Sequence, residues 1–263
     1  IRKKLKRQLQ ESRRLVADQL KGVSIVMEDF AKDIQKERKT HEKQESEIIA
    51  SIERAGLEVE GVEVYSLEEG NIDIDITLPS NLYNEGEKIV ATVLSAFSDK
   101  PIIVDADALF YVKELKESLK LRKTPVILTP HPGEMATLLN RTVKEVEENR
   151  LEIAKQFALH HRVYLLLKGH RSIIATPEGE LFINPVGNDA LGKGGSGDVL
   201  AGVILSFLGQ GATPLEALLA ATYLHALAGE EKGAELSHYR VTPTDVIDGI
   251  GSLLKRLYRT KKI

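Results

Sequence analysis

Cysteine is absent from this sequence of 263 residues. The absence excludes disulfides, thiolate zinc sites and cysteine nucleophiles, and it fits a reducing compartment, so we expect a cytoplasmic protein. Apolar runs long enough to cross a bilayer and a signal peptide are also lacking, which predicts no membrane span. The first residue is not methionine, so we expect a fragment of a longer chain.

An excess of charge of either sign is lacking as well, because the formal net charge is only −3. This balance gives no support to a nucleic-acid partner. Hydrophobic residues make up 42% and charged residues 29%, which is ordinary for a globular protein. The length fits one large α/β domain, or a small domain followed by a medium one.

Glycine and proline are nearly absent from residues 1–55, which are highly charged. Apolar residues there recur at alternating spacings of three and four between positions 16 and 34, which predicts a long helix with a heptad seam and, through it, a homo-oligomer. Residues 1–14 are rich in basic side chains. They form either a solvated helix end or a contact with a membrane surface or RNA.

Two alternating apolar and polar runs follow, at 62–67 and 72–78, with a Gly-Asn turn between them. This pattern predicts a β-hairpin with one buried face. Asp73 and Asp75 fall on the opposite face, where they are either a solvated surface or metal ligands.

From Lys100 onward, continuous apolar runs alternate with helical patterns. The runs at 101–104, 126–128 and 163–167 predict strands buried on both faces, and 172–175 with 180–183 predict an antiparallel hairpin at the sheet edge. Helices are expected at 85–97, 111–120, 142–159, 198–208, 214–230 and 243–258. The sequence therefore predicts an α/β fold with a mostly parallel sheet and flanking helices.

Polar clusters follow three of these strands, where ligands bind in open α/β sheets. Asp105 and Asp107 either hold a magnesium ion or a hydroxyl, or cap the next helix. His131 stands between two prolines in the turn 129–134, which is either a ligand-binding turn or a rigid turn with a capping acid. The stretch 168–172 suits a polyphosphate or adenylate, although an exposed basic hairpin has the same pattern.

The loop at 192–202 carries the strongest signal, because it has four glycines between Gly192 and Gly197 and opens a helix. Glycines let backbone N–H groups converge on an anion, and the helix dipole favours the same anion. Asp198, at the first turn, is placed to take a proton from a substrate hydroxyl, or it is a plain N-cap. The loop is not of the GxxxxGK[ST] type.

These motifs resemble the ribokinase-like superfamily, whose anion hole and catalytic aspartate read Gly-x-Gly-Asp. Within it, the chain resembles the ADP- or ATP-dependent NAD(P)H-hydrate dehydratases over about residues 98–263. The resemblance rests on four ordered motifs: 105–109, 129–134, 168–169, and Gly187-Asn188 running into the loop at 192–202. It implies a metabolite-repair lyase that removes water from hydrated NADH or NADPH while consuming ADP or ATP with Mg²⁺.

The resemblance also assigns roles to residues of this chain. Asp198 is implied as the base that acts on the substrate hydroxyl. The implied anion hole and nucleotide site consist of Gly194, Gly195, Ser196, Gly197, Lys168, Gly169, His170, Arg171 and Ser172. The implied contacts to the hydrated dinucleotide are His131, Asp107 and Asn188. No metal site formed by protein ligands is expected. Phe110 departs from the family, which usually has asparagine at this place.

Residues 1 to about 95 resemble an unrelated protein segment, the regulatory linker of the stage II sporulation serine phosphatase. The resemblance rests on the stretches 16–24, 27–31, 63–74 and 86–91. The phosphatase domain itself is absent. We therefore expect two parts, a helical and β-hairpin segment over 1–97 and a dehydratase segment over 98–263. The second lacks the family's usual first strand and glycine-rich segment, which suggests a chimera with its junction between 85 and 101.

Two alternatives to the dehydratase remain open. A ribokinase-like small-molecule kinase would use Asp198 to deprotonate an acceptor hydroxyl for phosphoryl transfer. A non-catalytic regulatory or assembly module, fused to an incomplete enzyme, would use the heptad seam to dock a partner. The N-terminal hairpin is a candidate to take the place of the missing sheet strands.

Overall fold

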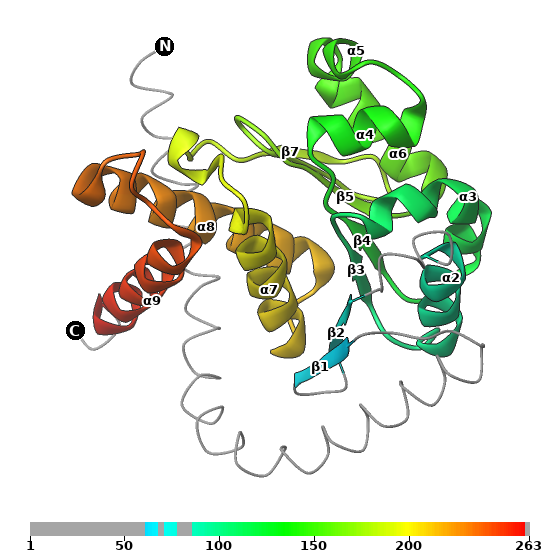
Figure 1. Cartoon of the computed structure of the whole chain (residues 1–263), viewed down its shortest axis with the longest axis horizontal. Helices are drawn as coiled ribbons and strands as arrows, with labels where there is room; N and C mark the ends of the chain where they lie inside the picture. Colours follow the sequence, from blue (N-terminus) through cyan, green and yellow to red (C-terminus); the bar gives the residue numbers. More distant parts are fainter. Residues whose placement is uncertain (1–60, 68–70, 78–85, 261–263) are drawn as a thin grey trace.

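The structure is a computed structural model that describes residues 61–67, 71–77 and 86–260 (Figure 1). The predicted helix over 16–34 and the basic cluster of residues 1–14 lie outside the described residues. Within the described part of the chain, no helix is long and apolar enough to cross a membrane.

The described strands form two separate sheets. The first is a hairpin of β1 (Gly61–Leu67) and β2 (Asn71–Thr77), paired antiparallel as the alternating pattern predicts. The second has the order β3-β4-β5-β6-β7, with parallel pairing of β3, β4 and β5 and antiparallel pairing of β6 and β7. Its strands are Ile102–Val104, Val126–Leu128, Tyr164–Leu167, Ile173–Ala175 and Leu181–Ile183.

Helices fill the connections between the strands. The α-helices are α2 (Gly86–Ala96), α3 (Ala108–Leu121), α4 (Pro132–Leu139), α5 (Val143–Glu148), α6 (Arg150–His161), α7 (Ser196–Gly209), α8 (Pro214–Leu236) and α9 (Pro243–Thr260), and the 3-10 helix η3 spans Asp189–Leu191. The single helix expected at 142–159 is wrong, because Asn149 interrupts it with a non-helical backbone and starts α6.

The five-stranded sheet is covered on both faces (Figure 1). Leu128, Leu165 and Leu167 belong to a hydrophobic cluster with residues of α3, α4 and α6, while Ile127 and Leu166 belong to a second cluster with residues of α7, α8 and α9. Neighbouring strand residues thus point to opposite faces, and both faces are buried. This explains why the parallel strands have continuous apolar sequences.

The hairpin does not extend the five-stranded sheet. The backbone groups of β1 and β2 pair with each other along seven residues each, and the two strands contact α7. Among the described strands, β3 pairs only with β4, so its other edge is open. The expectation that the hairpin could replace missing sheet strands is therefore wrong for the described residues.

Helix α2 is firmly attached to the sheet that follows it. The guanidinium of Arg122, at the end of α3, donates to the backbone carbonyls of Leu94, Phe97 and Lys100, the last two at 2.8 Å. Leu94 is buried in the same cluster as Val104 of β3. Helix α2 therefore packs with the elements that come after it, although it lies on the N-terminal side of the predicted domain boundary. The boundary between residues 97 and 98 remains a prediction.

Candidate active site

The carboxyl ends of three parallel strands bring three polar segments together. Asp105 follows β3, the turn 129–134 follows β4, and Lys168 follows β5. Two backbone hydrogen bonds continue the strand pairing into these segments, from Thr129 N to Val104 O at 3.2 Å and from Lys168 N to Pro130 O at 2.8 Å. The arrangement agrees with the rule that ligands bind at this edge of an open α/β sheet.

The Lys168 ammonium is the centre of a charged cluster. Its Nζ atom lies 2.6 Å from Asp105 Oδ1 and 3.9 Å from Glu134 Oε2. The three side chains are only 18%, 16% and 10% exposed. Burial makes each unpaired charge costly, so the two carboxylates and the ammonium stabilise one another. A lysine held in this way places an ammonium group at a fixed position beyond the carboxyl ends of the parallel strands.

The glycine-rich loop runs directly beside this cluster. A β-carbon added at Gly197 would lie 3.5 Å from Lys168 Nζ and 3.7 Å from Asp105 Oδ2. Gly195 is the N-cap of α7, with φ of +84°, and contributes no side-chain cap. The first N–H groups of α7 are therefore not capped by the N-cap side chain, and they can bind an anion together with the helix dipole.

Asp198 lies on the first turn of α7 and its side chain is exposed. It is not the N-cap, because Gly195 holds that position. Within the described ranges, no hydrogen bond or ion pair engages its carboxylate. A β-carbon added at Gly195 would lie 3.9 Å from Asp198 Oδ2, so the carboxylate stands at the loop itself. An exposed carboxylate beside an anion-binding loop can accept a proton from a hydroxyl that approaches the anion.

The loop rests on a buried histidine that sequence reasoning missed. His225 of α8 and Ser196 are both 6% exposed, and the ring Nε2 of His225 has no hydrogen-bond partner among the described residues. Burial lowers the pKa of His225 to about 4, against a smaller opposite effect of the Ser196 backbone. The ring is therefore neutral near pH 7.

His131 acts as a helix cap. Its Nδ1 accepts hydrogen bonds from Gly133 N at 3.0 Å and Glu134 N at 3.2 Å, while Glu134 Oε2 accepts from His131 N at 2.6 Å. This reciprocal pattern is a capping box, which agrees with the alternative of a rigid turn with a capping acid. Asp107 is the N-cap residue of α3, is exposed, and makes no side-chain capping bond.

The start of the glycine-rich loop is attached to the segment before α9. Asn188 Nδ2 lies 3.3 Å from His238 Nε2. Lys193 Nζ donates to the carbonyls of Tyr239 at 2.8 Å and Val241 at 2.6 Å. Tyr239 itself is 96% exposed. Asn188 thus lies at the base of the loop, where its side chain contacts His238 and the backbone of Ala190 and not the charged cluster.

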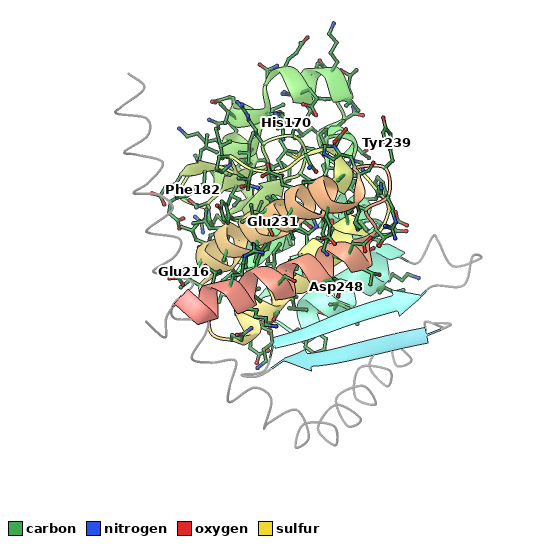
Figure 2. All side chains as sticks on the ribbon, turned by 90° about the vertical axis from the view of Figure 1, so that its left-hand side faces the viewer. His170, Phe182, Glu216, Glu231, Tyr239 and Asp248 are labelled. Atoms are coloured by element: carbon green, nitrogen blue, oxygen red, sulfur yellow. The ribbon has the colours of Figure 1, made fainter. Side chains whose placement is uncertain are left out.

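The hairpin after Lys168 is exposed. The side chains of His170 and Arg171 are on the surface, and Ser172 Oγ donates to Gly169 O at 3.1 Å. His170 and Tyr239 both lie in the upper half of the view in Figure 2. In their present contacts, His170 and Arg171 match the pattern of an exposed basic hairpin.

Some residues of the site were predicted and others were not. The structure brings Lys168, at the end of a strand, close to Gly197 and Asp198, at the start of α7. Asp105 was expected either to hold a magnesium ion or a hydroxyl or to cap a helix, and Glu134 was expected only as a capping acid, so their contacts with Lys168 were not predicted. Nothing in the local sequence pointed to His225, because its role depends on the packing of α8 against α7.

Comparison with known proteins gives two family matches. Residues 81–251 match the profile described as NAD(P)H-hydrate dehydratase, and residues 1–121 match the regulatory domain of SpoIIE. The two matches share residues 81–121, and the junction expected between 85 and 101 falls inside that range. The chain thus joins a segment similar to a sporulation regulator to a segment similar to a dehydratase.

Curated relatives repeat this division. The bifunctional NAD(P)H-hydrate repair enzyme of Moorella thermoacetica is 42% identical over 60% of this chain and 30% of its own length. The ADP-dependent (S)-NAD(P)H-hydrate dehydratase of Bacillus subtilis is 39% identical over 65% of this chain and 59% of its own length. Stage II sporulation protein E of Bacillus subtilis is 50% identical over 39% of this chain and 12% of its own length. The chain therefore spans less than two thirds of each.

Solved structures agree in fold. The ADP/ATP-dependent NAD(P)H-hydrate dehydratase of Bacillus subtilis, co-crystallised with ATP and Mg²⁺, superposes with a TM-score of 0.58 at 38% identity, covering 65% of this chain and 59% of that one. A ribokinase-like protein of Enterococcus faecalis gives 0.55 at 27% identity, covering 68% and 60%. The expected ribokinase-like fold is confirmed. With the match over 81–251 as well, the chain belongs to the NAD(P)H-hydrate dehydratase family.

Proposed function

We propose that this chain removes water from hydrated NADH or NADPH and consumes ADP or ATP in doing so. The observation that carries the proposal is the juxtaposition of the Lys168 cluster with the loop at 194–197 and the exposed Asp198. A fixed ammonium and the N–H groups of α7 suit a phosphate, and Asp198 suits the proton of a hydroxyl beside it.

The chemistry follows from these positions. The terminal phosphate of the nucleotide binds at Gly194, Gly195, Ser196 and Gly197, and Asp198 takes the proton of the substrate hydroxyl as its oxygen attacks the phosphorus. The P–O bond to the rest of the nucleotide breaks in the same step, so that AMP leaves from ADP or ADP leaves from ATP. The C–O bond of the phosphorylated substrate then breaks, inorganic phosphate leaves with the former hydroxyl oxygen, and a neighbouring ring carbon loses a proton to restore the double bond. Water is thus removed overall, its oxygen in inorganic phosphate and its two hydrogens as protons.

The remaining assignments are inferences from family membership. Lys168 and the stretch 169–172 would surround the adenosine nucleotide, and Asp107, His131 and Asn188 would contact the dinucleotide. Asp107 is exposed and makes no capping bond, so its carboxylate is available to a ligand. His131 keeps an exposed ring, with its side chain 55% accessible, although Nδ1 is used in capping.

A magnesium ion fits this site only together with the nucleotide. In the described ranges, no group of three or more histidine, aspartate or glutamate side chains could hold a metal ion. Mg²⁺ usually takes one or two carboxylates and the substrate phosphates, and Asp105 and Glu134 are carboxylates that lie 2.6 Å and 3.9 Å from Lys168 Nζ. When bound there, the ion would neutralise charge that develops on the phosphates.

Recovery of NADH absorbance from hydrated NADH tests the proposal. The full chain is compared with Asp198→Asn in the presence of ADP or ATP and Mg²⁺. We expect the variant to lose about 10²- to 10⁴-fold in turnover while it still binds nucleotide, because only the proton transfer is removed. Asp99→Asn is the matched control, since Asp99 is 73% exposed and lies before β3, at the opposite end of that strand. Equal turnover of Asp198→Asn and wild type would refute the assignment.

A non-catalytic regulatory or assembly module is the second candidate. The strand pairing favours it, because among the described strands β3 pairs only with β4 and the hairpin forms a sheet of its own, so that a partner strand could pair with β3. Nucleotide binding without turnover in the wild-type chain is the result that would support this candidate. A phosphorylated product from an added alcohol would instead indicate a kinase of the same fold.

A further inference from the structure

Arg150, the first residue of α6, reaches the turn that carries Lys168. Its Nη1 donates to His170 O at 2.6 Å, and its Nη2 lies 3.4 Å from Lys168 O and 3.5 Å from Leu167 O. One guanidinium thus faces three backbone carbonyls of the turn, those of Leu167, Lys168 and His170. The Arg150 side chain is 14% exposed, and its contacts with Leu167 O and Lys168 O are partly buried, whereas the bond to His170 O is exposed.

The glycine in this turn is fitted to the guanidinium. Gly169 has φ of +137°, a conformation that side-chain-bearing residues rarely adopt. A β-carbon at this position would stand 3.0 Å from Arg150 Nη2 and 3.4 Å from Arg150 Cζ. A methyl group here would be in tight contact with the guanidinium, which would have to shift by a few tenths of an ångström, and the positive φ would strain the backbone as well.

The backbone of Lys168 is fixed from two sides. Its N–H donates to Pro130 O at 2.8 Å, and its carbonyl faces Arg150. Its side chain then extends to Asp105, beside the glycine-rich loop. The backbone from which the ammonium extends is thus held by Pro130 and Arg150, while Asp105 and Glu134 lie near the ammonium itself.

Arg150 also lies near an acidic side chain of the preceding helix, α5. Its Nε is 3.8 Å from Glu147 Oε2, which is an ion-pair distance but too long for a hydrogen bond, and Nε has no hydrogen-bond partner among the described residues. The planar guanidinium offers N–H donors in a fixed geometry, which an ammonium cannot reproduce. Arginine at this place can therefore face several carbonyls of the turn at once.

We propose that Arg150 is a positioning residue for the turn 167–170, and that it sets the affinity for the nucleotide phosphates by holding Lys168 in place. The second part rests on the proposed function, while the first part does not. Arg150 itself contacts neither phosphate nor dinucleotide. It acts only through the backbone of the turn.

Two measurements on the full chain test the two parts separately. The first is hydrogen exchange of the peptide that covers 167–172, and the second is the dissociation constant of ATP with Mg²⁺. The variants are Arg150→Met, which removes the guanidinium, and Arg150→Lys, which keeps the charge near Glu147. Arg141→Met is the control, because Arg141 is exposed and makes none of these contacts.

We expect exchange in this peptide to be about tenfold faster in Arg150→Met, which corresponds to the loss of about 1.4 kcal/mol of local stability. The dissociation constant of ATP should rise about tenfold, whereas KM for hydrated NADH and the exchange of peptides in α8 should not change. Arg150→Lys should give a smaller shift in the same direction. Arg141→Met should behave as wild type.

Unchanged exchange at 167–172 in both Arg150 variants would overturn the positioning role. Faster exchange throughout the chain, with both ligands weakened equally, would show a general structural role and would also overturn it. Faster exchange confined to the turn, with no nucleotide binding even in the wild type, would refute the proposed function and leave the positioning role standing.

Discussion

Acidification should weaken the fold through His225. The ring is buried against the backbone of Ser196, and burial lowers its pKa to about 4 from the usual 6.5. The folded state therefore prefers the neutral ring, and between pH 6.5 and pH 4 the unfolded chain binds more protons. The contribution of His225 to stability is fully present above pH 6.5 and is lost as the pH falls toward 4.

The expected loss is large enough to measure. Each pH unit in this window costs about 1.4 kcal/mol, so the free energy of unfolding should fall by about 2 kcal/mol between pH 7.5 and pH 5 on account of this ring. Urea unfolding at both pH values measures it, with His225→Gln as the comparison, because glutamine keeps an N–H donor and does not titrate.

The variant should be less stable than wild type at pH 7.5, and its pH-dependent loss should be about 2 kcal/mol smaller. His161, a second buried histidine, is present in both proteins, so its contribution cancels in the comparison. Equal losses in both proteins would show that His225 is not held neutral, and would refute the account of how α8 supports the loop.

Three further substitutions address the fold around the site. Gly195→Ala should destabilise by about 1 to 3 kcal/mol in thermal or urea unfolding, because φ is +84° and the new methyl would stand 3.0 Å from Pro243 Cγ; an unchanged midpoint would contradict this strain. Thr213→Ala should cost about 1 kcal/mol, since Thr213 Oγ1 donates to Glu216 Oε2 at 2.7 Å and accepts from Glu216 N at 3.4 Å in a capping box; a loss below 0.3 kcal/mol would argue that the cap is not formed. Leu166→Ala should cost about 2 to 5 kcal/mol because the side chain is fully buried in β5, and a cost near zero would show that the sheet is not packed on this face.

Much of the fold could be predicted because its signals are local. Continuous apolar runs identified β3, β4 and β5, and the glycine-rich loop identified the start of α7. The boundary inside the helix expected at 142–159 could not be predicted. Asn149 ends α5 and starts α6 with an ordinary sequence around it, so no proline or glycine marked the break.

The candidate site divides in the same way. Its glycines and Asp198 are neighbours in the sequence, and their spacing alone suggested an anion-binding helix start. Glu134 had been considered only as a capping acid. The structure shows that one of its oxygens accepts the capping bond and also faces Lys168, which no local pattern could indicate.

The sequence by itself determined the strands, most of the helices and the order of the motifs, because periodicity, glycine and capping residues act over a few neighbouring positions. The tertiary structure alone decided which side chains meet. Lys168 and Asp105 are 63 positions apart, and Arg150 and His170 are 20 apart. Such contacts form only when parallel strands and their helices pack side by side. Packing between segments that are far apart in the sequence cannot be inferred from any one local stretch.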